Sequence, residues 1–249
     1  MSLDLQAAAN KRMRRGLITL AAIVVVLAVV VVLLLLTGGG KKDSDKGSGA
    51  GAGKPAPAVT HKPSDTFTQP KNWVLLPEGA GKDNGLPVKF PKSDEGAAAM
   101  MVAVIRSSWK LDQKDIERSA VTYSVPQERD EVKAAARDVA AGNRKNAGVP
   151  DNGPPPQDLA FSVIPIGVQW SRQDDTHVKV SVNVRTVIGG GNGKEPETQL
   201  ISTTGMAVWT DGDWKNASVP PVQNPEPFDI GDAGFNGAGW KAIQDGSKK

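Results

Sequence analysis

Side chains that could carry acid–base or metal chemistry are few in this chain. It has two histidines and no cysteine, which removes thiol catalysis, iron–sulfur clusters and cysteine-based zinc sites. His177 follows Asp174 and Asp175, and an imidazole beside a carboxylate is an arrangement that serves general acid–base catalysis or metal binding. The same residues suit a solvated hairpin tip with turn-forming aspartates. Because no second histidine lies nearby at ligand spacing, we favour the turn.

The glycine-rich run from Gly189 to Lys194 has a composition suited to phosphate binding. In a phosphate-binding loop the first position is glycine and the lysine is followed by Ser or Thr. Here Ile188 occupies the first position and Glu195 follows the lysine. The run therefore reads better as a flexible connection between two strands.

Two groups of carboxylates also invite a chemical reading. Asp112, Asp115 and Glu117 stand at the start of an expected helix, where acids complement the helix dipole. The segment 211–213 (DGD) lacks the further oxygen ligands that a calcium loop requires. We therefore expect no catalytic group, no metal site and no cofactor, and a protein that is not an enzyme. A hydrolase that uses His177, Asp174 and Asp175 is the catalytic alternative.

The elements that would position any site begin with a membrane anchor. Twenty consecutive uncharged residues give roughly 30 Å of helix, the thickness of a bilayer's hydrocarbon core. Thr19 is the only hydroxyl residue among them, and the rest of the chain is polar and interrupted by Gly and Pro. We expect one transmembrane helix over 17–37, with its length marked by Leu17, Ile23, Val30 and Leu36.

Basic residues before the apolar run set the expected orientation. Positive charge is retained on the cytoplasmic side, so the short N-terminus (1–16) is expected inside and the remainder outside the cytoplasm. A cleaved secretory signal is the alternative, but its apolar stretch is normally 7–15 residues long. The expected location is thus the cell membrane, with direct contact to the lipid bilayer. The residues that set the topology are Lys11, Arg12, Arg14 and Arg15.

Composition divides the rest of the chain into three parts. Residues 38–66 are rich in Gly, Ser, Ala and Pro and are expected to be a flexible linker. Residues 67–222 are long enough to bury a normal core and form the expected extracytoplasmic domain. Residues 223–249 are expected to be a Gly/Pro-rich tail, with only Phe228, Phe235 and Trp240 as possible docking residues. The net charge of +3 is small, so we expect no sequence-specific binding to nucleic acid.

Within the domain, helical patterns come first. Ser93 is a plausible N-cap for a helix whose apolar residues recur at helical spacing up to Trp109. A short helix over 113–120 and a third over about 126–141 follow, the third ending at Gly142 and Asn143.

Strand patterns follow the helices. Strands are expected over about 161–170, 177–186, 198–210 and 214–219, the second with strict alternation of valine and polar residues. The turn at 211–213 indicates a hairpin. Helices followed by antiparallel strands predict an α+β fold with helices packed on one curved sheet.

Six tryptophans carry most of the aromatic surface. They have the largest apolar area to bury, so most should be core, and a minority could be exposed contact anchors. The candidate core or interface residues are Trp109, Trp170, Trp209 and Trp214.

The resulting order, a membrane helix, a linker, three helices and about four antiparallel strands, resembles the inner-membrane scaffold proteins of type IV secretion and conjugation machines. Two local segments strengthen the resemblance. The sequence GLPVKFP (85–91), followed by EGAAA (95–99), is similar to the opening of exported domains from actinobacterial mobile elements. The sequence VWTDGDWK (208–215) is similar to the last hairpin of the same group.

The resemblance implies a nuclear-transport-factor-2-like cone: three helices packed on a curved antiparallel sheet of about four strands. It also implies a non-enzymatic scaffold of a conjugative DNA-transfer machine that assembles with itself and with other envelope proteins. The partners implied are a second copy, as a homo-oligomer, and other transfer-machine proteins. The alternative is a membrane-tethered module that binds or senses a ligand of the cell envelope on its concave sheet.

Overall fold

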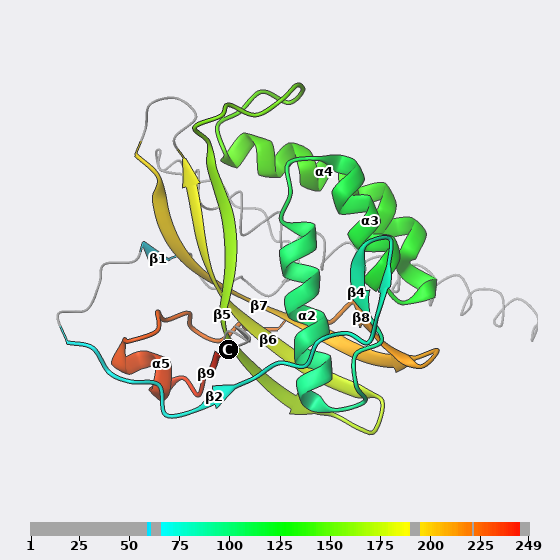
Figure 1. Ribbon diagram of the computed structural model, residues 1–249, viewed down its shortest axis with the longest axis vertical. Coiled ribbons are helices and arrows are strands. Elements are labelled where there is room, and N and C mark those ends of the chain that lie inside the picture. The colour runs from blue at the N-terminus through cyan, green and yellow to red at the C-terminus, as the bar shows by residue number, and fades with distance from the viewer. Residues whose placement is uncertain (1–58, 61–65, 190–194, 221, 245–249) are drawn as a thin grey trace, which may run out of the picture.

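The computed structural model describes residues 59–60, 66–189, 195–220 and 222–244. Its main sheet has seven strands (Figure 1), and six of them follow the order β1-β7-β6-β5-β9-β2, while β8 also pairs with β7. All neighbouring strands are antiparallel except β2 and β9, which are parallel. The strands are β1 (Val59–Thr60), β2 (Trp73–Val74), β5 (Ala160–Arg172), β6 (His177–Gly189), β7 (Glu197–Thr210), β8 (Asp213–Ala217) and β9 (Lys241–Ile243). A separate hairpin joins β3 (Gly81–Asp83) to β4 (Leu86–Val88).

The central strand β6 sets which residues face each side of the sheet. Its alternating valines from Val178 to Val184 are fully buried in the main core, as alternation along a half-buried strand predicts. This side is the helix-covered face. The residues between the valines, such as Asn183 and Arg185, point to the opposite side, which we name the back face.

Helix α2 (Asp94–Ser108) crosses the helix-covered face (Figure 1). Its expected N-cap is confirmed, because the Ser93 hydroxyl accepts a hydrogen bond from the Gly96 amide at 3.1 Å. Only glycine fits at position 96, since a Cβ there would lie 1.9 Å from the carbonyl oxygen of Pro91.

Helix α3 (Gln113–Tyr123) and helix α4 (Arg129–Asn146) pack on one another beyond α2, with the 3₁₀ turn η1 (Pro126–Glu128) between them. The helix expected to end at Gly142 and Asn143 continues to Asn146. Asn143 is fully buried and donates from Nδ2 to the Lys110 carbonyl at 2.7 Å. That contact holds the last turn of α4 in place, and the turn-forming glycine is Gly148, at φ +66°.

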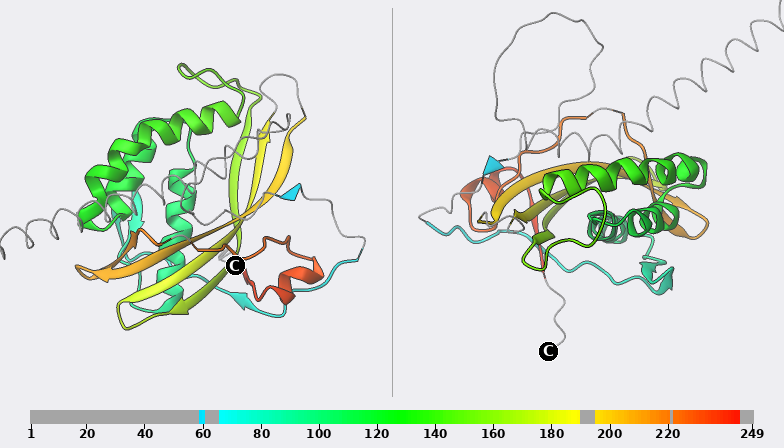
Figure 2. Two further views of the ribbon diagram at one scale, coloured as in Figure 1. Left: turned by 180° about the vertical axis from the view of Figure 1, so that it is seen from behind. Right: turned by 90° about the horizontal axis from the view of Figure 1, so that it is seen from above.

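The C-terminal segment, residues 222–244, covers the back face. Asn183 donates from Nδ2 to the Phe228 carbonyl at 2.6 Å, and Arg185 pairs with the buried Asp229. The segment contains α5 (Ala233–Gly237) and ends in β9. Seen from behind (Figure 2, left), α5 lies beside β2 at the edge of the sheet. A small apolar cluster fills the space below this segment, formed by Phe235, Trp240 and Ala242.

The expected fold class is therefore wrong in its sheet. The cone with about four antiparallel strands is replaced by a wider mixed sheet, in which β9 lies between β5 and β2. The reason lies in residues 223–249, which we expected to be a tail. In the part of them that the structure describes, buried aromatic side chains pack on the sheet. The helices and the strands β5 to β8 lie near the ranges that the patterns predicted, although α4 continues to Asn146.

The expected anchor and most of the expected linker lie outside the described residues. This applies to the transmembrane segment 17–37 and to the basic residues before it. From the linker range 38–66, the structure describes β1, which pairs with β7, and Thr66. Among the described residues, no helix is long and apolar enough to cross a bilayer.

Candidate functional site

Two of the four singled-out tryptophans belong to the core. Trp214 is fully buried and donates from its indole nitrogen to the Pro91 carbonyl at 2.8 Å. Trp109 ends α2, is buried, and stacks on Phe161 of β5 with ring centroids 6.3 Å apart. Both residues serve the fold and are inaccessible to a partner.

The other two tryptophans are half-buried on the helix-covered side. Trp209 contacts Trp214 edge to face at 5.3 Å. Trp170 lies below the Lys241 ammonium, which is 3.2 Å from the ring centroid. Burial lowers the pKa of Lys241, and the nearby charges of Glu95 and Asp94 oppose that shift.

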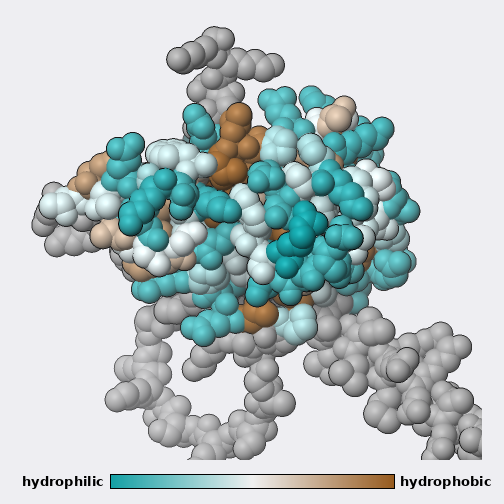
Figure 3. Space-filling view, turned by 90° about the horizontal axis from the view of Figure 1, so that it is seen from below, coloured by the Kyte–Doolittle hydropathy of each residue, from teal (hydrophilic) through white to brown (hydrophobic). Residues whose placement is uncertain are grey.

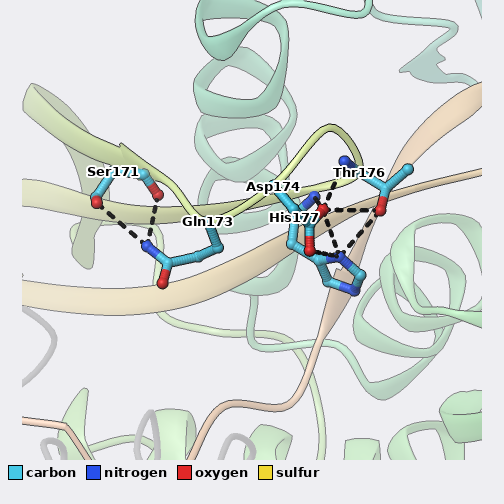
Figure 4. A network of polar contacts seen from close by, with 5 residues as sticks. All are labelled: Ser171, Gln173, Asp174, Thr176 and His177. Carbon is cyan, nitrogen blue, oxygen red and sulfur yellow. Dashed lines mark hydrogen bonds and ion pairs between the residues drawn. The ribbon is translucent and has the colours of Figure 1, made fainter.

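The His177 cluster forms the tip of the β5–β6 hairpin (Figure 4). The Asp174 carboxylate accepts hydrogen bonds from the backbone amides of Thr176 at 2.7 Å and His177 at 2.9 Å. It also contacts His177 Nδ1 at 3.0 Å. These bonds, led by that from the Thr176 amide, hold the pKa of Asp174 well below its ordinary value. The aspartate organises a turn, as the turn reading predicted.

The acidic residues at the start of α3 also make only local contacts within that helix. Asp112 caps α3 by accepting from the Lys114 amide at 2.7 Å, and Asp115 pairs with Arg118 one turn later. Within the described residues, no group of three His, Cys, Asp or Glu side chains could hold a metal ion. The glycine-rich connection lies mostly outside the described residues.

Asp213 is a buried carboxylate that joins β8 to the segment after β4. Its Oδ1 accepts from the amides of Phe90 at 3.0 Å and Trp214 at 2.9 Å, and Lys215 lies 3.1 Å from its Oδ2. Tyr123 nearby donates its hydroxyl to the Pro87 carbonyl at 2.9 Å. Burial, with the Asp213 charge as the second cause, raises the pKa of Tyr123. The cluster ties β4, α3 and β8 together.

Sequence reasoning did not single out the large apolar side chains that are exposed to solvent and could contact a partner. Four large apolar side chains of the described chain reach solvent: Phe67 (73% exposed), Leu75 (61%), Trp73 (49%) and Ile164 (44%). Seen from below, the surface is mostly hydrophilic and its hydrophobic groups are confined to small areas (Figure 3). A signal was present in the sequence, since Trp73 and Leu75 are two residues apart in a short run bounded by Pro70 and Pro77.

Three of these side chains share the back face. Trp73 lies opposite Ala242 of β9, which lies opposite Gly167 of β5 and then Asn183 of β6. Leu75, two residues after Trp73, points to the same side. Ile164 does so as well, because it lies opposite Arg185. Trp73 and Leu75 thus lie on the back face at β2, and Ile164 lies on the same face of β5, two strands away.

No protein-family model, no curated protein and no solved structure matches this chain.

Proposed function

We propose that this protein is a non-enzymatic, membrane-anchored assembly component of a conjugative DNA-transfer machine, which acts through protein–protein contacts outside the cytoplasm. The observation that carries the proposal is the exposure of three large apolar side chains on the back face, Trp73 and Leu75 at the edge strand β2 and Ile164 on β5. Large apolar side chains at a surface are typical of contact sites. The similarity of segments 85–91 and 208–215 to exported domains of mobile elements points to the machine.

The packing of the sheet supports a contact function. On the helix-covered face, the valines of β6 are fully buried below α2. On the back face, Phe235 and Trp240 are fully buried as well. A ligand held on the concave sheet, the alternative reading, would have to displace α2. The edge strand β2, in contrast, carries the half-exposed Trp73 and is accessible to a partner.

The buried charged groups support the same view. Asp213 joins β8 to Phe90, Asp229 pairs with Arg185, and Arg144 donates to the carbonyls of Pro150 and Gly153 at 2.6 and 2.7 Å. Each of these groups is engaged in holding chain segments together. Such engagement is typical of buried charges that stabilise a fold.

The proposal is tested in the native cell with a photo-crosslinking residue at Ile164 or Phe67, one position at a time. We expect covalent products with other components of the transfer machine, identified by mass spectrometry. The matched control carries the same residue at Asp151, which is exposed on the loop after α4 and away from the edge strand.

Deletion of the gene provides the second readout. We expect transfer of the mobile element to fall by orders of magnitude and to be restored by the intact chain. The triple variant D174A/D175A/H177A should restore transfer too, because these residues form a turn. Unchanged transfer after deletion would refute the proposed function. Loss of restoration by a folded triple variant would favour the hydrolase.

A further inference from the structure

We propose that segment 67–75 docks on the surface of the bilayer in which the protein is anchored, with Phe67, Trp73 and Leu75 in contact with lipid. This inference deepens the proposed function and rests on it, because it assigns a lipid neighbour to part of the same exposed region. The three side chains are the most exposed large apolar groups of the described chain. They also lie within nine residues of one another.

The three side chains are presented on one side of the molecule. Trp73 and Leu75 point to the back face at β2. The Phe67 ring packs against Gly231 of the C-terminal segment, since a Cβ at that glycine would lie 2.6 Å from the ring. Because the C-terminal segment covers the back face, Phe67 lies on the outer side of that cover.

Hydrogen bonds hold the segment in this position. The Thr68 amide donates to the Gly231 carbonyl at 2.6 Å. Asn236 of α5 binds the next residues, because its Oδ1 accepts from the Lys71 amide at 2.8 Å and its Nδ2 donates to the Gln69 carbonyl at 3.0 Å. The backbone is thus ordered before any contact is made, which lowers the entropic cost of binding.

The point where the chain enters the fold places this end of the molecule beside the bilayer. The expected anchor ends at residue 37, and β1 begins at Val59. A flexible chain of the intervening length spans roughly 25 Å root-mean-square, while a compact fold of this size is roughly 40 Å across. In all views, β1, α5 and the chain leading into β2 lie at the same end of the molecule (Figures 1 and 2). The expected tether therefore holds this end nearer to lipid than the opposite end.

The composition of the segment favours lipid as its occupant. Aromatic residues and leucine beside a basic residue, here the exposed Lys71, are typical of sequences that bind at a membrane interface. A stable protein interface buries roughly 1,200–2,000 Å², more than three side chains can bury. A bilayer accepts each apolar side chain separately, and the lysine suits its anionic headgroups. The contact is weak, and the tether strengthens it by raising the effective concentration.

The contact can be tested because the chain has no cysteine. The full-length F67C chain is labelled with an environment-sensitive fluorophore and reconstituted into vesicles of zwitterionic and anionic phospholipids that carry a nitroxide on the acyl chain. We expect the nitroxide to quench this label several-fold more than a label on D151C, which lies on the exposed loop after α4.

Further variants of the labelled F67C chain separate docking from misfolding. W73E/L75E should reduce the quenching several-fold, because both charges oppose insertion. L75E alone changes a side chain that is 61% exposed, so it should reduce the quenching with an unchanged melting temperature. The matched control A134E/A141E adds two negative charges at exposed positions of α4 and should leave the quenching unchanged.

Equal quenching at positions 67 and 151, or quenching that survives W73E/L75E, would overturn the inference. So would a label at position 67 whose emission shows burial without quenching by lipid, because a protein would then cover the segment. The proposed function survives these failures if the chain stays in the vesicles and machine components are captured at Ile164. A chain recovered free of the vesicles would contradict the expected anchor, and with it the proposed function.

Discussion

At the residue scale, the buried ionisable side chains of this protein mainly hold separate chain segments together. Asp213 shows this most clearly, because one buried carboxylate accepts from two backbone amides and also faces Lys215. Asp211, two residues earlier in the same hairpin, is exposed. Two aspartates with the same sequence context therefore have different roles, which depend on the groups that each one contacts.

The first prediction compares these two aspartates. D213N replaces one acceptor oxygen with an amide that faces the Lys215 ammonium, and should lower the free energy of unfolding by about 1–3 kcal/mol. D211N should have little effect, because asparagine tolerates the positive φ of 54° at that position. Urea denaturation of the two variants measures the difference. Equal stabilities would show that the Asp213 bonds add nothing.

The second prediction concerns Asp174. Its pKa is lowered, so its contribution to stability is present above its unfolded pKa of about 3.9 and is lost as pH falls through the folded value. Carboxyl NMR titration should give a midpoint below the ordinary 3.8. H177A should leave much of the shift, because the largest cause is the Thr176 amide. A midpoint that returns to the ordinary value in H177A would assign the shift to the histidine instead.

At the element scale, periodicity predicted the helices and long strands well, because their apolar residues repeat with the period of the face that they bury. The Ser93 cap and the valines of β6 are examples. The end of α4 was missed because Gly142 and Asn143 resemble a stop signal. The tertiary contact of Asn143 with Lys110 outweighs that local preference, and no local pattern reports such a contact.

The third prediction uses two helical glycines. G96A should destabilise the protein by about 1–3 kcal/mol, because its Cβ would overlap the Pro91 carbonyl. G142A should stabilise it by up to about 1 kcal/mol, since a Cβ there meets nothing within 4 Å and alanine favours the helix. Thermal or urea unfolding of both variants gives the signs. Stabilisation by G96A would contradict this prediction and show that the Pro91 carbonyl can move away from the added Cβ at little cost.

At the scale of the whole molecule, the C-terminal segment explains why the sheet was predicted too narrow. The Gly and Pro content of this segment is typical of a tail. Its packing on the sheet was not predicted, because its buried side chains are spaced irregularly and the strand β9 is short. Phe235 and Trp240 could be named from the sequence as possible docking residues, but the strand β9 that follows them and its place between β5 and β2 could not. The candidate contact site could not be predicted for a related reason. Exposure of Trp73 depends on β2 being an edge, which follows from the whole strand order.

The fourth prediction is the loss of cooperative folding when residues 223–249 are removed. Two fully buried aromatic side chains, each worth about 3–5 kcal/mol, are lost from a fold whose net stability is typically about 5–15 kcal/mol. The control chain ends at Gln244 and should unfold cooperatively. Circular dichroism melting and limited proteolysis of the two chains provide the measurement. An unchanged melting curve for the shorter chain would show that the segment is dispensable.

The parallel pairing of β2 with β9 also has a consequence for biosynthesis. A ribosome releases Trp73 long before Ala242, its neighbour in the sheet. Strand β2 must therefore wait, without its partner, until residues 241–243 have emerged. Contacts so distant along the chain form slowly. Completion of this edge of the sheet is thus a late step of folding.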